Sequence, residues 1–94
     1  MHLSPDAAET IALNALNWLV SNEELLGVFM GSTGAGADDL LTGAANPEFL
    51  GSVLDFLLLD DAWVIEFCNS CDIEYSQLIP ARAALPGGDQ IHWT

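Results

Sequence analysis

The chain has 94 residues, with one Lys or Arg, 14 Asp or Glu, and a formal net charge of −13. This length suits a single domain, and the charge argues against DNA, RNA or an anionic membrane as a direct ligand, because phosphates require basic side chains. Hydrophobic residues make up 51% of the chain, which is enough to form a core and argues against disorder.

The two cysteines and the N-terminal residues predict a location. Residues 1–6 contain neither the basic nor the apolar region of a secretory signal, and no apolar run approaches the ~20 residues of a membrane-spanning helix. Two cysteines are too few for a disulfide framework. We therefore expect a cytoplasmic protein.

The first 44 residues predict three helices. Ser4 followed by Pro5 and Asp6 is a capping residue, a first-turn proline and an acid that faces the positive end of the helix dipole. The predicted helices run from about 5 to 20, from 22 to 33, and from 38 to 42. Glycines within residues 31–36 end the second helix.

The following residues predict three further helices with similar starts. Asn46, Pro47 and Glu48 repeat the order of cap, proline and acid. The predicted helices run from about 47 to 59, from 60 to 70, and from 74 to 85. Pro80 lies inside the last of them and is expected to kink it, because proline lacks a backbone donor.

A 38-residue internal repeat relates the two sets of helices, since residues 11–41 align without a gap over residues 49–79. The identical pairs are Leu16/Leu54, Leu19/Leu57, Phe29/Phe67, Ser32/Ser70 and Leu40/Leu78. Such a period is typical of supersecondary units that stack on a shared core, although composition alone can align two ordinary amphipathic helix pairs.

We therefore predict an all-α fold: one domain over residues 1–94, built as a compact bundle of about five to six helices. Two tandem three-helix repeats, at about residues 5–44 and 46–85, would form it, and residues 86–94 would form a tail. No segment alternates as a half-buried strand would.

Two stretches also carry a resemblance. They are the segment Leu-Asp-Phe-Leu-Leu at residues 54–58 and the run Ala-Arg-Ala-Ala-Leu-Pro-Gly-Gly-Asp at residues 81–89. With the Ala-rich first helix and the closing His92-Trp93-Thr94, the whole chain resembles a family of small alphaproteobacterial proteins described only as a domain of unknown function. The resemblance implies a small cytoplasmic bacterial protein and supplies no catalytic residues.

Cys68 and Cys71 form the one motif with known chemistry, a C-x-x-C pair. Dithiol redox proteins place this pair at a helix start, where the dipole favours thiolate, whereas here it falls at a predicted helix end. A structural zinc would need two more ligands, for which only carboxylates and the distant His2 and His92 are available. We interpret the pair as structural free cysteines, with a regulatory disulfide or a metal site as alternatives.

The paired acids also invite a catalytic reading. All three pairs fall where helices are predicted to begin, so their favoured role is to stabilise the helix dipole: Glu23/Glu24, Asp38/Asp39 and Asp60/Asp61. His92 has no nucleophile motif nearby, and the glycines of 31–36 follow a helix rather than a strand. We therefore predict no enzyme and assign no catalytic, cofactor-binding or metal-binding residue.

Three residues bear on partners. Arg82, the single basic residue, is expected to pair with a nearby carboxylate. Ile91 and Trp93 follow a diglycine hinge, and they either fold back on the chain's own core or dock on another subunit or partner.

Three functional hypotheses remain. The first is a helical protein-interaction module, bound to itself or to a partner, because a small domain with this apolar content leaves some of it exposed. The second is a nucleic-acid mimic that binds a basic protein, which requires carboxylates in rows at phosphate-like spacing. The third is a minor redox or metal role for Cys68 and Cys71.

Overall fold

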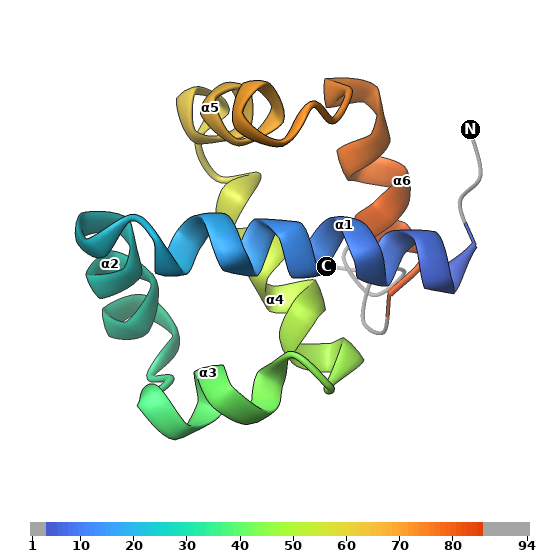
Figure 1. Ribbon diagram of the computed structural model, residues 1–94. Helices are drawn as coiled ribbons and strands as arrows, with labels where there is room; N and C mark the ends of the chain where they lie inside the picture. The colour runs from blue at the N-terminus through green and yellow to red at the C-terminus, as the bar shows by residue number, and fades with distance from the viewer. Residues whose placement is uncertain (1–3, 86–94) are drawn as a thin grey trace, which may run out of the picture.

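The computed structural model describes residues 4–85, and every regular element in that range is a helix (Figure 1). The elements are α1 (Pro5–Val20), α2 (Glu23–Thr33), α3 (Ala37–Gly43), α4 (Pro47–Leu57), α5 (Asp61–Cys71), the 3-10 turn η1 (Tyr75–Gln77) and α6 (Leu78–Ala83). The predicted all-α fold is confirmed. Among residues 4–85, no helix combines the length and the apolar character needed to cross a membrane.

Helices α1 and α4 form the centre of the molecule. In Figure 1, α1 crosses in front of α4, and the other helices lie around this pair. Both helices present an apolar face at helical spacing, so each turn adds side chains to the same interface. The buried residues are Ala8, Ile11, Ala12, Ala15, Leu16 and Leu19 on α1, and Leu50, Gly51, Val53, Leu54, Phe56 and Leu57 on α4.

Aromatic contacts join each half of the chain to the other. Trp18 on α1 meets Phe67 on α5 edge to face, with ring centroids 6.0 Å apart. Phe29 on α2 meets Phe56 on α4 in the same manner at 5.3 Å. Phe29 and Phe67 are fully buried, so both second helices are anchored on the first helix of the opposite half.

Helices α2 and α5 begin and end at matching points of the sequence alignment. Their caps, Asn22 and Asp60, accept hydrogen bonds from the backbone N–H groups of Leu25 and Ala62. Both helices have 11 residues and end in a left-handed residue, Gly34 with φ 76° and Asp72 with φ 55°. The predicted starts and ends of these helices are therefore met within one residue.

The last helical segment differs from the prediction. In place of one kinked helix over residues 74–85, η1 leads into α6, and Pro80 is the third residue of α6. In a continuous helix, Pro80 could not donate to the carbonyl of Ser76 and its ring would crowd that carbonyl. The 3-10 turn, in which the Gln77 N–H donates to the Glu74 carbonyl, avoids this conflict.

The predicted end of the fourth helix is also two residues too late, because α4 ends at Leu57. The residue that follows, Leu58, caps the helix, and Asp60 already caps α5.

The residues Ile91, His92 and Trp93 lie outside the described range, so their expected roles stay predictions.

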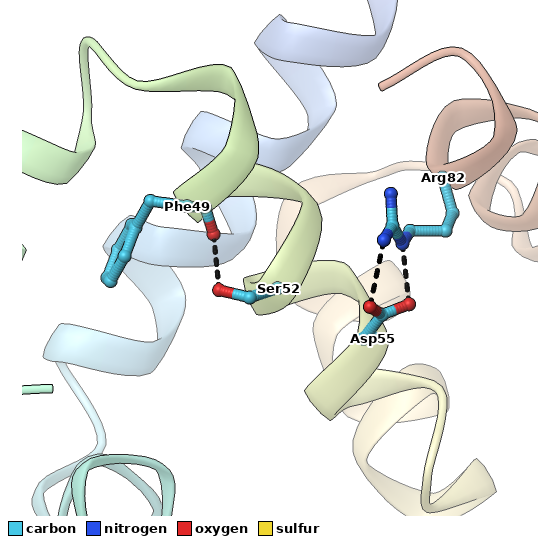
Figure 2. A network of polar contacts seen from close by, with 4 residues as sticks. All are labelled: Phe49, Ser52, Asp55 and Arg82. Carbon is cyan, nitrogen blue, oxygen red and sulfur yellow. Dashed lines mark hydrogen bonds and ion pairs between the residues drawn. The ribbon is translucent and has the colours of Figure 1, made fainter. Parts of the chain in front are cut away.

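Arg82 pins α6 to α4, as Figure 2 shows. Its Nε and one terminal nitrogen donate to the two carboxylate oxygens of Asp55, at 2.5 and 2.9 Å. The Arg82 side chain is only 10% exposed, whereas that of Asp55 is 51% exposed. The expected pairing of the single basic residue with a carboxylate is thus confirmed, and it holds two segments of the second half together.

Candidate functional site

The cysteines lie at the C-terminal end of α5, as predicted. Cys68 is buried, Cys71 is the last residue of the helix, and both are free thiols. Burial raises the pKa of the Cys68 thiol above its ordinary value, and the neighbouring Cys71 raises it further. A thiol with a raised pKa is a weak nucleophile at neutral pH, so the geometry does not favour dithiol redox chemistry. Among residues 4–85, no cluster of three or more His, Cys, Asp or Glu side chains is placed to hold a metal ion.

The three acid pairs lie at helix starts, where the sequence predicted them. Asp39 accepts a hydrogen bond from the backbone N–H of Gly36 at 2.9 Å, and Asp60 accepts one from that of Ala62 at 2.8 Å. Glu23 and Glu24 occupy the first turn of α2. These carboxylates therefore lie on separate helices and stabilise helix ends.

A groove between α2 and α5 is the strongest candidate for a site. It has a volume of about 350 Å³ and is lined by apolar side chains with acids beside them. The lining residues are Asn22, Glu24, Leu25 and Val28 of the α2 segment, and Trp63 and Glu66 of α5. Val28 is 51% exposed, so this apolar surface is open to solvent.

Trp63 is held in place from the side of the core. Its indole stacks on the Phe56 ring of α4, with centroids 4.7 Å apart and an angle of 21° between the planes. Phe56 is itself buried against Phe29, so the indole rests on a rigid support. The indole itself is only partly buried. A fixed aromatic side chain at the wall of a groove loses little entropy when another chain covers it.

A second hollow adjoins the groove at the start of α2. It has a volume of about 540 Å³ and is lined by Trp18, Ser21, Asn22, Glu23 and Glu24. Two of these residues, Asn22 and Glu24, also line the groove, so the two hollows meet at the start of α2. Each contains one tryptophan supported by a phenylalanine of the core.

The electrostatics of both hollows are of one sign. Among the described residues that line them, three are glutamates and none is Lys or Arg. Arg82, the only basic residue of the chain, is bound to Asp55. The combined surface is therefore apolar at Leu25, Val28 and the two tryptophans, and negative at the three glutamates.

A third hollow, of about 350 Å³, lies between α2 and α4 and is less suited to a ligand. It is lined by Ser32, Thr33, Ser52, Asp55, Phe56 and Leu59. The Ser32 and Thr33 hydroxyls donate to the Phe29 carbonyl, and the Ser52 hydroxyl donates to the Phe49 carbonyl (Figure 2). Asp55 is bound by Arg82, so the polar groups of this hollow are largely occupied within the fold.

The sequence predicted exposed apolar surface but did not locate it. Leu25 and Trp63 occupy equivalent positions of the 38-residue alignment, as do Val28 and Glu66. That equivalence was a usable signal, because matched positions on two neighbouring helices can line one groove.

Comparison with known proteins identifies the family of the chain. Residues 5–88 match the family described as Protein of unknown function (DUF3572). The chain belongs to the DUF3572 family. The match includes all six α-helices and the groove residues of the described range. No curated protein and no solved structure matches this DUF3572 chain.

Proposed function

We propose that this DUF3572 chain is a small acidic helical module that binds a protein partner. The observation that supports the proposal is the groove between α2 and α5, where half-exposed Val28 and partly buried Trp63 form an apolar surface. Aromatic residues on a rigid support are enriched among residues that dominate binding energy at protein interfaces. Self-association, through surface other than this groove, is the second mode that the proposal includes.

Other exposed apolar side chains support it less. Leu41 is 80% exposed on α3, Leu59 is 77% exposed after α4, and Ile79 is 64% exposed on α6. Isolated apolar residues on separate elements are common on soluble domains. The groove differs because its apolar side chains line one concave surface.

A nucleic-acid mimic is the alternative reading of the −13 charge. A mimic needs carboxylates in rows at phosphate-like spacing. Many of the acids instead cap or begin five different helices: Asp6, Glu23, Glu24, Asp38, Asp39, Glu48, Asp60 and Asp61. This distribution gives the mimic little support. A redox or metal role for Cys68 and Cys71 is the remaining alternative, and the raised pKa of Cys68 weighs against it.

We also place the protein, as part of the same proposal, in the cytoplasm of an alphaproteobacterium. The supporting features are the family resemblance of residues 81–89, the closing His92-Trp93-Thr94, and the small number of cysteines.

Site-specific photo-cross-linking tests the interaction. A benzophenone side chain would replace Val28 in the groove, and in a matched chain it would replace Ile79, which is also apolar and exposed. In Figure 1, α2 and α6 lie on opposite sides of the molecule. In the native host, we expect a discrete protein adduct from position 28 and none from position 79.

Competition completes this experiment. Excess unmodified chain should suppress the adduct, and excess Val28→Glu chain should not, because covering that carboxylate with apolar side chains of a partner would cost its hydration free energy. An equal adduct pattern from both positions, or no adduct from position 28, would contradict the interaction module.

A further inference from the structure

We infer that the groove between α2 and α5 takes a basic amphipathic helix of another protein. This inference rests on the proposed function and names the chemistry of its partner. The groove offers apolar contacts through Leu25, Val28 and Trp63, which lie on two adjacent helices. An amphipathic helix buries such apolar side chains from one of its faces, and a groove between two helices has the matching shape.

The negative charge beside the groove favours basic residues on the polar face of the partner helix. Glu24 lies on the α2 side of the groove and Glu66 on the α5 side, and both are exposed. The partner helix would place an apolar side chain in the groove. Arg or Lys residues three or four positions before and after it on the same helix would then lie near Glu24 and Glu66. The adjoining hollow adds Glu23 to the same negative edge.

A second copy of the chain does not supply this chemistry. Each copy has a net charge of −13, and its one basic residue is largely buried and bound to Asp55. Two copies that met through this groove would bring glutamates against acidic surface, which costs free energy. The same argument excludes nucleic acid from the groove, because phosphates would face carboxylates.

Aromatic support increases the selectivity of the surface for such a helix. Trp63 stacks on Phe56, and Trp18 in the adjoining hollow packs against Phe67, so both indoles are oriented before binding. An indole face attracts a guanidinium or ammonium group as well as an apolar side chain. A helix with a stripe of Leu flanked by Arg therefore matches both the groove and the adjoining hollow.

Binding of two synthetic peptides tests the inference. Both would carry the same Leu stripe at helical spacing, one with Arg on the flanking positions and one with Glu. We expect the Arg peptide to bind, with an affinity that falls as salt concentration rises, and the Glu peptide to bind at least about tenfold more weakly. Fluorescence anisotropy of the labelled peptides gives the dissociation constants.

Matched variants separate the groove from the overall charge. Glu24→Gln with Glu66→Gln removes two acids at the groove, and Glu48→Gln with Glu9→Gln removes two acids elsewhere. Glu24 and Glu48 both lie in the first turn of a helix, and Glu66 and Glu9 both lie inside one, so each pair removes one acid of each kind. Chemical unfolding of both double variants measures any difference in their stability. We expect about fivefold weaker binding of the Arg peptide for the groove pair and less than about twofold for the other.

Two outcomes overturn the inference. One is equal weakening by both double variants, which indicates diffuse attraction to an acidic protein, and the other is absence of binding by the Arg peptide. If the Arg peptide fails while benzophenone at position 28 still yields a discrete adduct, the partner chemistry is wrong and the interaction module stands. If both fail, the proposed function is wrong as well.

Discussion

The two halves of the chain share their first two helices and differ in the third segment. Phe29 and Phe67 are fully buried at equivalent positions of α2 and α5. By contrast, α3 buries only Gly43 and leaves Leu41 80% exposed, whereas α6 buries Leu78, Ala81 and Arg82. The shared part builds the core, and the third segment of the second half covers it against α1 and α4.

This difference shows how similar sequences can reach different packing. Helix α6 packs closely against the two central helices, α1 and α4, whereas α3 packs against them only loosely. Continuing the 38-residue offset two residues beyond the aligned segment pairs Gly43 with Ala81, and both are buried. Substitutions at equivalent positions of α2 and α5 test whether the two halves contribute equally to the free energy of unfolding. Substitutions in α3 and α6 test how far the third segments differ in that contribution.

The largest expected effect concerns the shared anchors. Phe29→Ala and Phe67→Ala should each lower the free energy of unfolding by about 3–5 kcal/mol, because each removes a fully buried ring. Each also removes an edge-to-face contact with the opposite half, Phe56 or Trp18 respectively. Guanidinium chloride unfolding followed by circular dichroism gives both values.

Phe29→Leu and Phe67→Leu serve if the alanine variants do not fold, with an expected cost of about 1–2 kcal/mol each. Costs that differ between the two positions by more than about 2 kcal/mol would show that one half supplies most of the core.

The next effect separates the third segments. A methyl group at Gly43 would overlap the Phe49 ring, which packs at right angles to Phe29. Gly43→Ala should therefore cost about 1–3 kcal/mol, although alanine normally favours a helix over glycine. Thermal and chemical unfolding measure this change.

The equivalent exchange in the second half provides the control. Ala81 is fully buried on α6, so Ala81→Gly removes a packed methyl group and lowers helix propensity, at a cost of about 1–2 kcal/mol. A stabilising Gly43→Ala would mean that Phe49 moves freely and that α3 is not held by this contact.

A smaller effect concerns the ion pair between Arg82 and Asp55, which lies within the second half. Asp55→Asn removes the charge that faces the largely buried Arg82 guanidinium, and should cost about 1–2 kcal/mol because the carboxylate is half exposed. The equivalent position in the first half is Asn17, which is exposed. Asn17→Asp should change stability by less than about 0.5 kcal/mol, and a comparable loss at both positions would argue against a specific role for the pair.

Helix limits were largely predictable because they depend on local chemistry. Asn22 and Asp60 cap their helices through their own side chains, and Gly34 ends α2 in a left-handed conformation. The division of residues 74–85 into η1 and α6 was not predictable in detail, since the position of the break depends on how α6 packs against α1 and α4. Pro80 signalled a break but not its place.

The candidate groove was harder to predict than the fold. An apolar residue on an amphipathic helix is buried only if a neighbouring helix covers it, and Val28 and Trp63 face a gap between two helices. Local sequence signals do not report that gap. The positions of Cys68 and the acid pairs were easier to anticipate, because they follow from the predicted helix end and helix starts.

The smallest expected effect compares Cys68 with Met30, its counterpart in the first half, which does not titrate. Burial and the nearby Cys71 raise the pKa of Cys68 above its ordinary value of 9.0. The folded chain thus holds this proton more tightly than the unfolded chain, and the resulting stability is present below the ordinary value and lost as pH rises through the folded pKa. Cys68→Ala should cost about 1 kcal/mol at neutral pH, and this difference should narrow as the pH rises through and above the ordinary thiol value of 9.0.

Urea unfolding of both chains across that rise in pH measures the effect. The pKa of Tyr75 is raised mainly by the Asp61 carboxylate and least by Cys68. Both chains should therefore also carry Tyr75→Phe, which removes this second titration from the difference. A Met30→Ala variant provides the matched control, because its difference from the parent chain should not change with pH. A Cys68→Ala difference that stays constant would mean that Cys68 ionises equally well in the folded and unfolded chain, and its burial would then be too loose to distinguish this position from an exposed thiol.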